Sequence, residues 1–237
     1  MLRVLVSLPV AVACTAALGI PSIAVGLVDH SGRFARRAAG AWGRLLLVTW
    51  GVRVVVAGRE NVPEGPAVYA ANHGSVLDIP ILFGHLPVDF RIIHKRSLYY
   101  APLLGAYLYL GGHIGIDRDR AFGARRSLAR AAERIRRGTS VAVFPEGTRS
   151  PDAGVRAFKR GSFVLALNAG VPVVPVSLAG VKRLAPRGLL RLRPGTVFLT
   201  IHPAVSTEGR DARDAGVLAA EVRRVVAGAC ALEGGAA

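Results

Sequence analysis

Hydrophobic positions at the start of the chain form one unbroken block. No charged residue occurs from Val4 to Val28, a run of 25 residues, and about 20 apolar residues suffice to cross the hydrocarbon core of a bilayer. A cleaved signal peptide is the competing interpretation, because Arg3 precedes the apolar run. The run exceeds the roughly 7–15 apolar residues of such a peptide, so we expect an embedded helix.

A second, shorter apolar stretch follows a basic cluster. Leu45–Val48 lies between two tryptophans and close to arginines, namely Trp42, Trp50, Arg33, Arg36, Arg37 and Arg44. Tryptophan and arginine are typical of the membrane interface, and basic clusters favour its cytoplasmic side. We expect a membrane-associated pair of helices over residues 1–57 and a second domain over residues 58–237. The alternative is that both helices belong to the core of a soluble domain.

The pattern then changes to short β-rich runs that alternate with helical stretches. Strands are predicted over Arg53–Ala57, Ala67–Ala71, Asp89–His94, Ser140–Phe144, Val173–Leu178 and Val197–His202. Helices are predicted over Pro102–Leu110, Phe122–Arg137, Ser162–Ala169 and Asp214–Cys230. This alternation predicts an α/β fold with a mainly parallel, twisted sheet flanked by helices.

Composition narrows the class of partner. The formal charge is +16, and 51% of the residues are hydrophobic. A basic excess suits nucleic acid, anionic lipid or phosphorylated substrates. Only 6% of the residues are aromatic, too few for base-stacking platforms, so we expect a phospholipid membrane and no nucleic acid. Cys14 and Cys230 form no metal-binding pattern, and no metal site is expected.

His73 and Asp78 are the clearest candidates for chemistry. A neutral imidazole can take a proton from a hydroxyl near pH 7, and an acid on its other nitrogen fixes the tautomer. On one helix, five residues would place the two side chains about 140° apart. They converge only if His73 lies in a loop and Asp78 lies on the following helix. Gly74 permits such a loop, and Ser75 is the predicted N-cap.

Three further segments lie at predicted junctions between helices and strands, and with Asn72–Asp78 they form an ordered set. The segments are Gly112–Arg118, Phe144–Ser150 and Val171–Val176. Together the four resemble the motifs of the 1-acylglycerol-3-phosphate acyltransferase family, over roughly residues 61–177. Gly115 departs from the pattern, because an aromatic residue is usual there, so packing beside the acceptor site is expected to differ.

The resemblance implies roles for particular residues. His73 would act as general base and Asp78 would orient it, without a covalent acyl-enzyme. The acceptor would be bound by Arg118, Glu146, Gly147, Thr148 and Arg149, with Lys95 and Lys159 as helpers. Glu146 would hold a glycerol hydroxyl or orient Arg149. An amide near Gly74 would supply the oxyanion hole.

The resemblance also implies the reaction and its location. A fatty acyl group would pass from acyl-CoA or acyl carrier protein to the sn-2 hydroxyl of lysophosphatidic acid, giving phosphatidic acid for phospholipid biosynthesis. The alternative is another acceptor on the same fold: a lysophospholipid, a lyso-ornithine lipid or glycerol-3-phosphate. No cofactor is expected. Residues 58–237 would be the acyltransferase domain, at the cytoplasmic face of the cell membrane.

Overall fold

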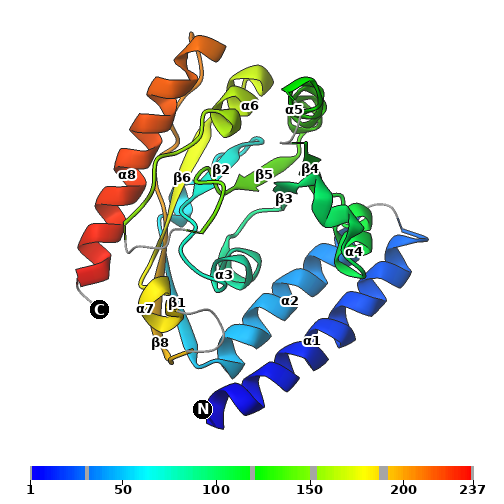
Figure 1. The fold of residues 1–237 in the computed structure, drawn as a ribbon. Helices are drawn as coiled ribbons and strands as arrows, with labels where there is room; N and C mark the ends of the chain where they lie inside the picture. Colours follow the sequence, from blue (N-terminus) through cyan, green and yellow to red (C-terminus); the bar gives the residue numbers. More distant parts are fainter. Residues whose placement is uncertain (1, 30–31, 118–120, 150–153, 187–191, 236–237) are drawn as a thin grey trace.

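The fold is built on one twisted, seven-stranded sheet (Figure 1). A computed structural model describes residues 2–29, 32–117, 121–149, 154–186 and 192–235. The strand order is β1-β8-β6-β2-β5-β3-β4. The strands are β1 (Val52–Ala57), β2 (Val68–Ala71), β3 (Phe90–Lys95), β4 (Ile114–Ile116), β5 (Ser140–Val143), β6 (Val173–Ala179) and β8 (Gly195–Ile201).

Helices alternate with these strands, as the sequence predicts. The α-helices are α1 (Leu2–Gly26), α2 (Arg33–Thr49), α3 (Asp78–His85), α4 (Leu104–Leu110), α5 (Ala121–Arg136), α6 (Gly161–Ala169), α7 (Val181–Leu184) and α8 (Ala215–Gly235). Short 3-10 helices are η1 (Arg59–Asn61), η2 (Arg96–Tyr100) and η3 (Ala212–Asp214).

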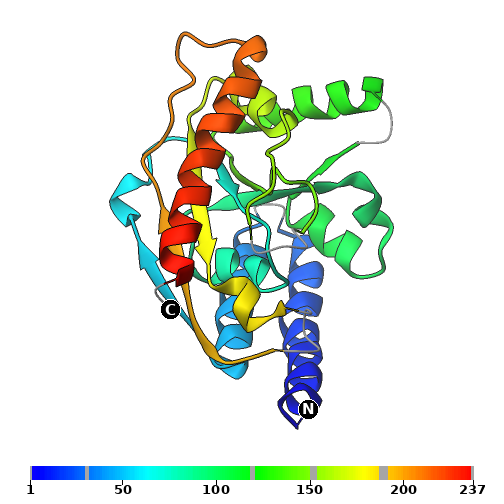
Figure 2. The ribbon, with the colours of Figure 1, turned by 60° about the vertical axis from the view of Figure 1, so that its left-hand side comes forward.

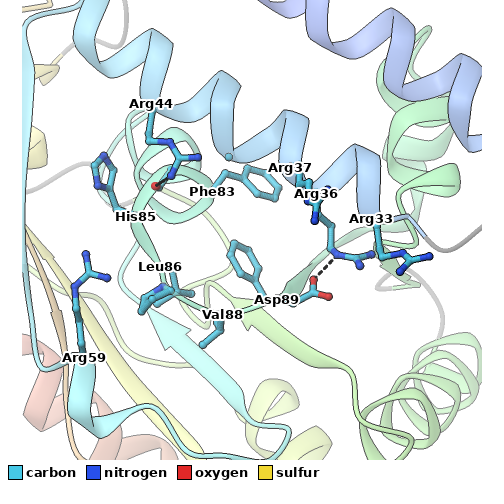
Figure 3. Close-up of a pocket in the computed structure, with 14 residues that line it drawn as sticks. Arg33, Arg36, Arg37, Arg44, Arg59, Phe83, His85, Leu86, Val88 and Asp89 are labelled. Atoms are coloured by element: carbon cyan, nitrogen blue, oxygen red, sulfur yellow. Dashed lines mark hydrogen bonds and ion pairs between the residues drawn. The ribbon is translucent and has the colours of Figure 1, made fainter.

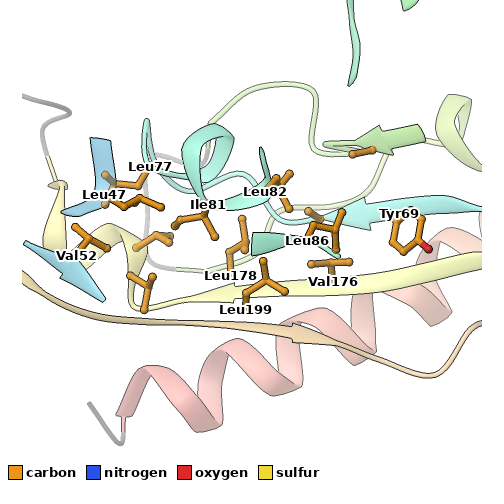
Figure 4. Packing of buried hydrophobic residues seen from close by; sticks show 14 of the residues in the cluster. Leu47, Val52, Tyr69, Leu77, Ile81, Leu82, Leu86, Val176, Leu178 and Leu199 are labelled. Atoms are coloured by element: carbon orange, nitrogen blue, oxygen red, sulfur yellow. The ribbon is translucent and has the colours of Figure 1, made fainter. Parts of the chain in front are cut away.

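Two apolar clusters pack against the two faces of the sheet. Side chains alternate in β2, so that Tyr69 and Ala71 belong to one cluster while Val68 and Ala70 belong to the other. The Tyr69 side joins the sheet to α2 and α3 through Leu47, Leu77, Ile81 and Leu82 (Figure 4). The other side is covered by α5, α6 and α8 (Figure 2). Both faces are therefore buried, as parallel sheets require.

Strand direction decides where a site can form. The five neighbouring strands β6, β2, β5, β3 and β4 are parallel, whereas β8 is antiparallel to β6 and parallel to β1. The carboxyl ends of the parallel strands share one edge of the sheet, where ligands of such folds collect. The predicted mainly parallel sheet flanked by helices is thus confirmed.

The N-terminal helix pair forms an additional layer outside α3. α2 packs on α3, and α1 packs along α2, where the Trp42 indole N–H donates to Thr15 Oγ1 at 2.9 Å (Figure 1). Pro9–Gly26 of α1 has a mean hydropathy of 1.7, and only 17% of this window is buried within the protein. Among the described residues, α1 alone has the length and composition to cross a membrane.

Some local predictions were wrong. Helix α3 begins at Asp78 with Leu77 as its N-cap, so Ser75 is not the cap; its Oγ accepts the Leu77 N–H at 3.3 Å instead. The sequence also missed β4 and α7, because three or four residues are too short to show a period. The boundary at residue 57 stays a prediction, although β1, which lies just before it, pairs with β8 in the sheet.

Candidate active site

The structure brings His73 and Asp78 into direct contact at the catalytic edge, the edge formed by the carboxyl ends of the parallel strands. His73 lies in the loop after β2, and Asp78 is the first residue of α3. The imidazole Nδ1 lies 2.7 Å from Asp78 Oδ2. The Asp78 side chain is fully buried, whereas that of His73 is 17% exposed. The His73 ring is therefore accessible, and the Asp78 carboxylate that contacts it is shielded from water.

The loop between the two residues folds back onto the Asp78 carboxylate. The backbone N–H groups of Gly74 and Ser75 both donate to Asp78 Oδ2 at 2.9 Å. The other oxygen, Oδ1, is buried and has no hydrogen-bond partner among the described residues. These two amides thus bind Asp78 in this structure, and the oxyanion-hole donor near Gly74 stays a prediction.

Burial dominates the electrostatics of Asp78. Desolvation raises the pKa of this carboxyl group above its ordinary value, and the hydrogen bond from His73 lowers the pKa in part. The backbone N–H groups of Ser75 and Gly74 lower it further. A buried carboxylate is costly unless it is well paired, and the three donors that gather on Oδ2 supply that pairing.

The segment after β5 supports His73 from the opposite side. The Phe144 ring stacks on the imidazole, with ring centroids 4.2 Å apart and planes inclined by 21°. The carboxylate of Glu146 is buried, and its two oxygens accept two backbone N–H groups: that of His73 at 2.7 Å and that of Arg156 at 3.0 Å. Glu146 thus joins the loop that carries His73 to the segment that carries Arg156.

The same segment brings further predicted residues together. Gly147 has φ +79°, and a Cβ there would lie 2.8 Å from the ammonium nitrogen of Lys159. Lys159 therefore lies against Gly147, and its backbone N–H donates to the Pro145 carbonyl at 2.9 Å. Thr148 is exposed, and its hydroxyl accepts from the Arg156 guanidinium at 3.3 Å. Cationic groups thus cluster beside the glycine turn.

The structure gives less information on the other cations that the sequence predicts at the site. Arg149 is exposed at the end of this segment. Lys95 is exposed at the carboxyl end of β3 and therefore lies on the same edge of the sheet as His73. Arg118 lies outside the described residues. The binding roles of Glu146, Gly147, Thr148 and these cations stay predictions.

Tyr99 occupies the space that a side chain at position 115 would fill. A Cβ on Gly115 would lie only 2.5 Å from the Tyr99 ring. The Tyr99 hydroxyl donates to the His113 carbonyl at 2.7 Å and accepts from the Gly115 N–H at 3.1 Å. The departure from the aromatic pattern at Gly115 is therefore matched by an aromatic ring that η2 supplies.

Asn72 connects the catalytic loop to the sheet. Its side-chain amide donates to the Leu178 carbonyl at 3.0 Å and accepts from the Leu178 N–H at 2.8 Å. Val171–Val176 leads into β6, beside β2. The first and last motifs are thus held together, on the strands that position His73. Among the described residues, no cluster of three or more His, Cys, Asp or Glu side chains could hold a metal ion.

Comparison with known proteins agrees with this geometry. A family model described as acyltransferase matches residues 53–179, more than half of the chain and all of the elements that carry the catalytic loop. The chain belongs to the acyltransferase family. The resemblance inferred from the four motifs is thereby confirmed.

Individual acyltransferases show how far the similarity extends. A 1-acyl-sn-glycerol-3-phosphate acyltransferase of Chlamydomonas reinhardtii is 42% identical over 156 residues, 65% of this chain and 47% of that protein. One of Pseudomonas aeruginosa is 36% identical over 170 residues, 71% of this chain and 65% of that protein. The chain thus spans about half to two thirds of the length of these relatives.

A solved structure covers nearly the whole chain. The crystal structure of the 1-acyl-sn-glycerophosphate acyltransferase PlsC from Thermotoga maritima matches with a TM-score of 0.81 at 30% identity, over 97% of this chain and 93% of that one. The similarity includes the N-terminal helix pair, because so little of either chain is left out. The acyltransferase fold is therefore shared from α1 to α8.

Sequence reasoning missed the residues that support His73. Phe144 and Asn72 belonged to recognised motifs, but they received no role because stacking and amide pairing need three-dimensional contacts. Arg156 and Tyr99 lie outside all four motifs. Only one feature of the sequence pointed to Tyr99, and it did so indirectly. The family pattern has an aromatic residue at position 115, this chain has glycine there, and another residue was needed to supply the ring.

Proposed function

We propose that the protein transfers a fatty acyl group from a thioester to the sn-2 hydroxyl of lysophosphatidic acid, giving phosphatidic acid. The observation that carries this proposal is the 2.7 Å contact between His73 Nδ1 and Asp78 Oδ2 at the catalytic edge. The printed names of the relatives, 1-acyl-sn-glycerol-3-phosphate acyltransferases, support the choice of acceptor. No serine, cysteine or lysine nucleophile is required, because the substrate brings the hydroxyl.

His73 is the general base in this proposal. Asp78 accepts a hydrogen bond from the Nδ1–H group, so Nε2 carries the lone pair that takes the hydroxyl proton. The sn-2 oxygen attacks the thioester carbonyl carbon, a C–O bond forms, and the C–S bond then breaks. The imidazolium returns its proton to the departing thiolate. Asp78 stabilises the imidazolium between the two proton transfers.

The acceptor phosphate is assigned to the cations beside Gly147. Lys159 lies against this glycine, and Arg149 follows it by two residues. A guanidinium binds phosphate oxygens through paired hydrogen bonds, whereas an ammonium acts as a point charge. Lys95, at the carboxyl end of β3, belongs to the proposed set, and Arg118 is included from its motif alone. The two carboxylate oxygens of Glu146 already accept the backbone N–H groups of His73 and Arg156. A hydroxyl of the acceptor that binds Glu146 would therefore donate to an oxygen that also accepts one of these N–H groups.

We place the enzyme on the cell membrane with its active site at the cytoplasmic face. The support is α1, whose apolar surface is mostly not covered by the protein. Lysophosphatidic acid and its product carry acyl chains, so a membrane-attached enzyme meets both without extracting them into water. The excess of arginine suits anionic headgroups on that face.

One assay tests the function and its donor. Purified protein in mixed micelles is given labelled lysophosphatidic acid with either acyl-CoA or acyl carrier protein thioester, and the diacyl product is quantified. We expect labelled phosphatidic acid with at least one donor. Matched reactions contain glycerol-3-phosphate, lysophosphatidylcholine or a lyso-ornithine lipid. Acylation of one of these and not of lysophosphatidic acid would contradict the proposed acceptor.

A further inference from the structure

A basic groove lies between α2 and the end of α3 (Figure 3). Its volume is about 640 Å³. The ionisable side chains that line it are Arg33, Arg36, Arg37, Arg44, Arg59, His85 and Asp89. The first four come from α2, Arg59 comes from η1, His85 is the last residue of α3, and Asp89 lies between α3 and β3.

The charge of the groove is strongly unbalanced. Five arginines face one lining acid, Asp89, and this acid already pairs with Arg36 at 2.8 Å and with Arg91 at 2.7 Å. Burial and then the positive charge of Arg91 lower the pKa of Arg36. Burial, Arg44 and Arg59 lower the pKa of His85. The contributions of Arg91, Arg44 and Arg59 to these shifts agree with the excess of positive charge among the lining residues.

The groove also has an apolar wall. Phe83, Leu86, Val88 and Phe90 line it, and Leu86 and Val88 face the arginines of α2 in Figure 3. Gly40 lies among these arginines on the same helix and adds no side chain. Arg33 and Arg44 are eleven residues apart, about 16 Å along the helix axis. The groove is therefore long enough for an amphipathic anion and much larger than one phosphate ion.

The position of the groove separates it from the reaction. β2 and β3 both run parallel to β5, so Phe90 at the start of β3 lies at the edge opposite His73. Helix α3 connects the two places, because Asp78 begins it and His85 ends it. Its eight residues correspond to about 12 Å. An anion in this groove is therefore distinct from the acceptor phosphate at Gly147.

We propose that this groove binds the phosphate-bearing headgroup of an anionic phospholipid. The arginines of α2 and Arg59 bind the phosphate, because guanidinium groups form charge-assisted, paired hydrogen bonds with phosphate oxygens. The apolar wall contacts the glycerol and the first acyl carbons. α2 packs along α1, so the groove lies next to the helix that we place in the membrane. The assignment rests on that proposed membrane attachment.

Thermal unfolding with short-chain lipids tests this site. The full chain is purified in a non-ionic detergent, and its Tm is followed during titration with dihexanoyl phosphatidylglycerol or dihexanoyl phosphatidylcholine. The groove variant carries Arg37→Gln, Arg44→Gln and Arg59→Gln, three exposed positions. The control variant carries Arg126→Gln, Arg130→Gln and Arg224→Gln, which are exposed on α5 and α8 and remove the same charge.

A ligand that binds only the folded state raises Tm with increasing concentration. We expect phosphatidylglycerol, and not phosphatidylcholine, to raise the Tm of the wild type and of the control variant by several degrees. The groove variant should need at least a tenfold higher lipid concentration for the same shift. An equal response of all three proteins, or an equal loss in both variants, would overturn the proposal. Stabilisation by inorganic phosphate at the same concentrations would overturn the lipid assignment.

Two further measurements separate this test from folding and from function. If the triple variant does not fold, Arg59→Gln alone replaces it in the titration, because this substitution changes only η1. The single variant should need a several-fold higher lipid concentration for the same Tm shift. Acyl transfer is assayed in the same samples. A groove that fails to bind lipid leaves acyl transfer intact, whereas failure of the proposed function abolishes acyl transfer and leaves the lipid-dependent Tm shift.

Discussion

Glu146 holds the backbone of His73 and not its ring: the carboxylate oxygen Oε1 accepts the His73 N–H at 2.7 Å. The second oxygen accepts the Arg156 N–H at 3.0 Å. The acid of the third motif therefore sets the position from which the proposed base acts. A role in positioning and a role in binding the acceptor predict different kinetics for the same substitution.

Glu146→Gln should lower kcat and leave KM for lysophosphatidic acid nearly unchanged. The amide NH₂ would face one of the two backbone N–H groups, so one hydrogen bond is lost and His73 shifts. A displacement of about 1 Å costs on the order of 100-fold in rate. Steady-state kinetics measures both constants. A raised KM with an unchanged kcat would instead assign Glu146 to the acceptor.

Asp78 should make the folded state less stable as pH rises. The pKa of Asp78 in the folded state is raised above 3.8, the ordinary value that it has in the unfolded chain. At a pH between the unfolded-state pKa and the folded-state pKa, the folded state therefore binds more protons than the unfolded state. The free energy of unfolding therefore falls as pH increases through that window. Asp78→Asn removes this dependence, while acyl transfer falls by roughly 100- to 10,000-fold because the base loses its partner.

Chemical denaturation between pH 3.5 and pH 7 measures this dependence. The comparison is made between His73→Ala and His73→Ala/Asp78→Asn, so that titration of the imidazole does not contribute. The stability of the single variant relative to the double variant should decrease with rising pH. A relative stability that is constant, or that increases with pH, would show that burial does not control this carboxyl group.

The cations beside Gly147 should distinguish acceptors by their phosphate. Lys159→Gln and Arg149→Gln should each raise KM for lysophosphatidic acid, by about 10-fold for a lost charge-assisted hydrogen bond of roughly 1.5 kcal/mol. Any activity toward monoacylglycerol, which lacks the phosphate, should not change. Equal effects on both acceptors would mean that these residues act on the fold and not on the phosphate.

Tyr99 and Gly115 should behave as one packing unit. Gly115→Phe should destabilise the protein because a Cβ already lies 2.5 Å from the Tyr99 ring. Tyr99→Ala should destabilise it as well, through the lost ring and its two hydrogen bonds. The double variant should recover part of both losses, which a double-mutant cycle of unfolding free energies measures. Additive losses would show that the two positions are independent.

Long periodic segments and ordered motifs were the predictable part of this protein. The predicted ranges of α5, α6, β5 and β6 agree with the structure within one or two residues, because burial of a whole helix face or strand leaves a clear pattern. β4 and α7 carry too few residues for such a pattern. The antiparallel direction of β8 also has no local signal, since it depends on which strands become neighbours.

The site divides in the same way. His73 and Asp78 were predictable, because the spacing required a loop before a helix and the structure has that arrangement. The stacking of Phe144 and the use of Glu146 on backbone amides depend on loops that are 71 and 73 positions away from His73 in the sequence. Side-chain identity alone could not distinguish an acid that binds substrate from one that binds the chain.

The most direct test of the central claim is the acyl-transfer rate of His73→Ala. A general base contributes roughly 100- to 10,000-fold to the rate, so we predict a loss of that size in kcat with an unchanged far-UV spectrum and nearly unchanged Tm. A folded variant that transfers the acyl group within a few-fold of the wild-type rate would contradict the assignment of His73 as the base.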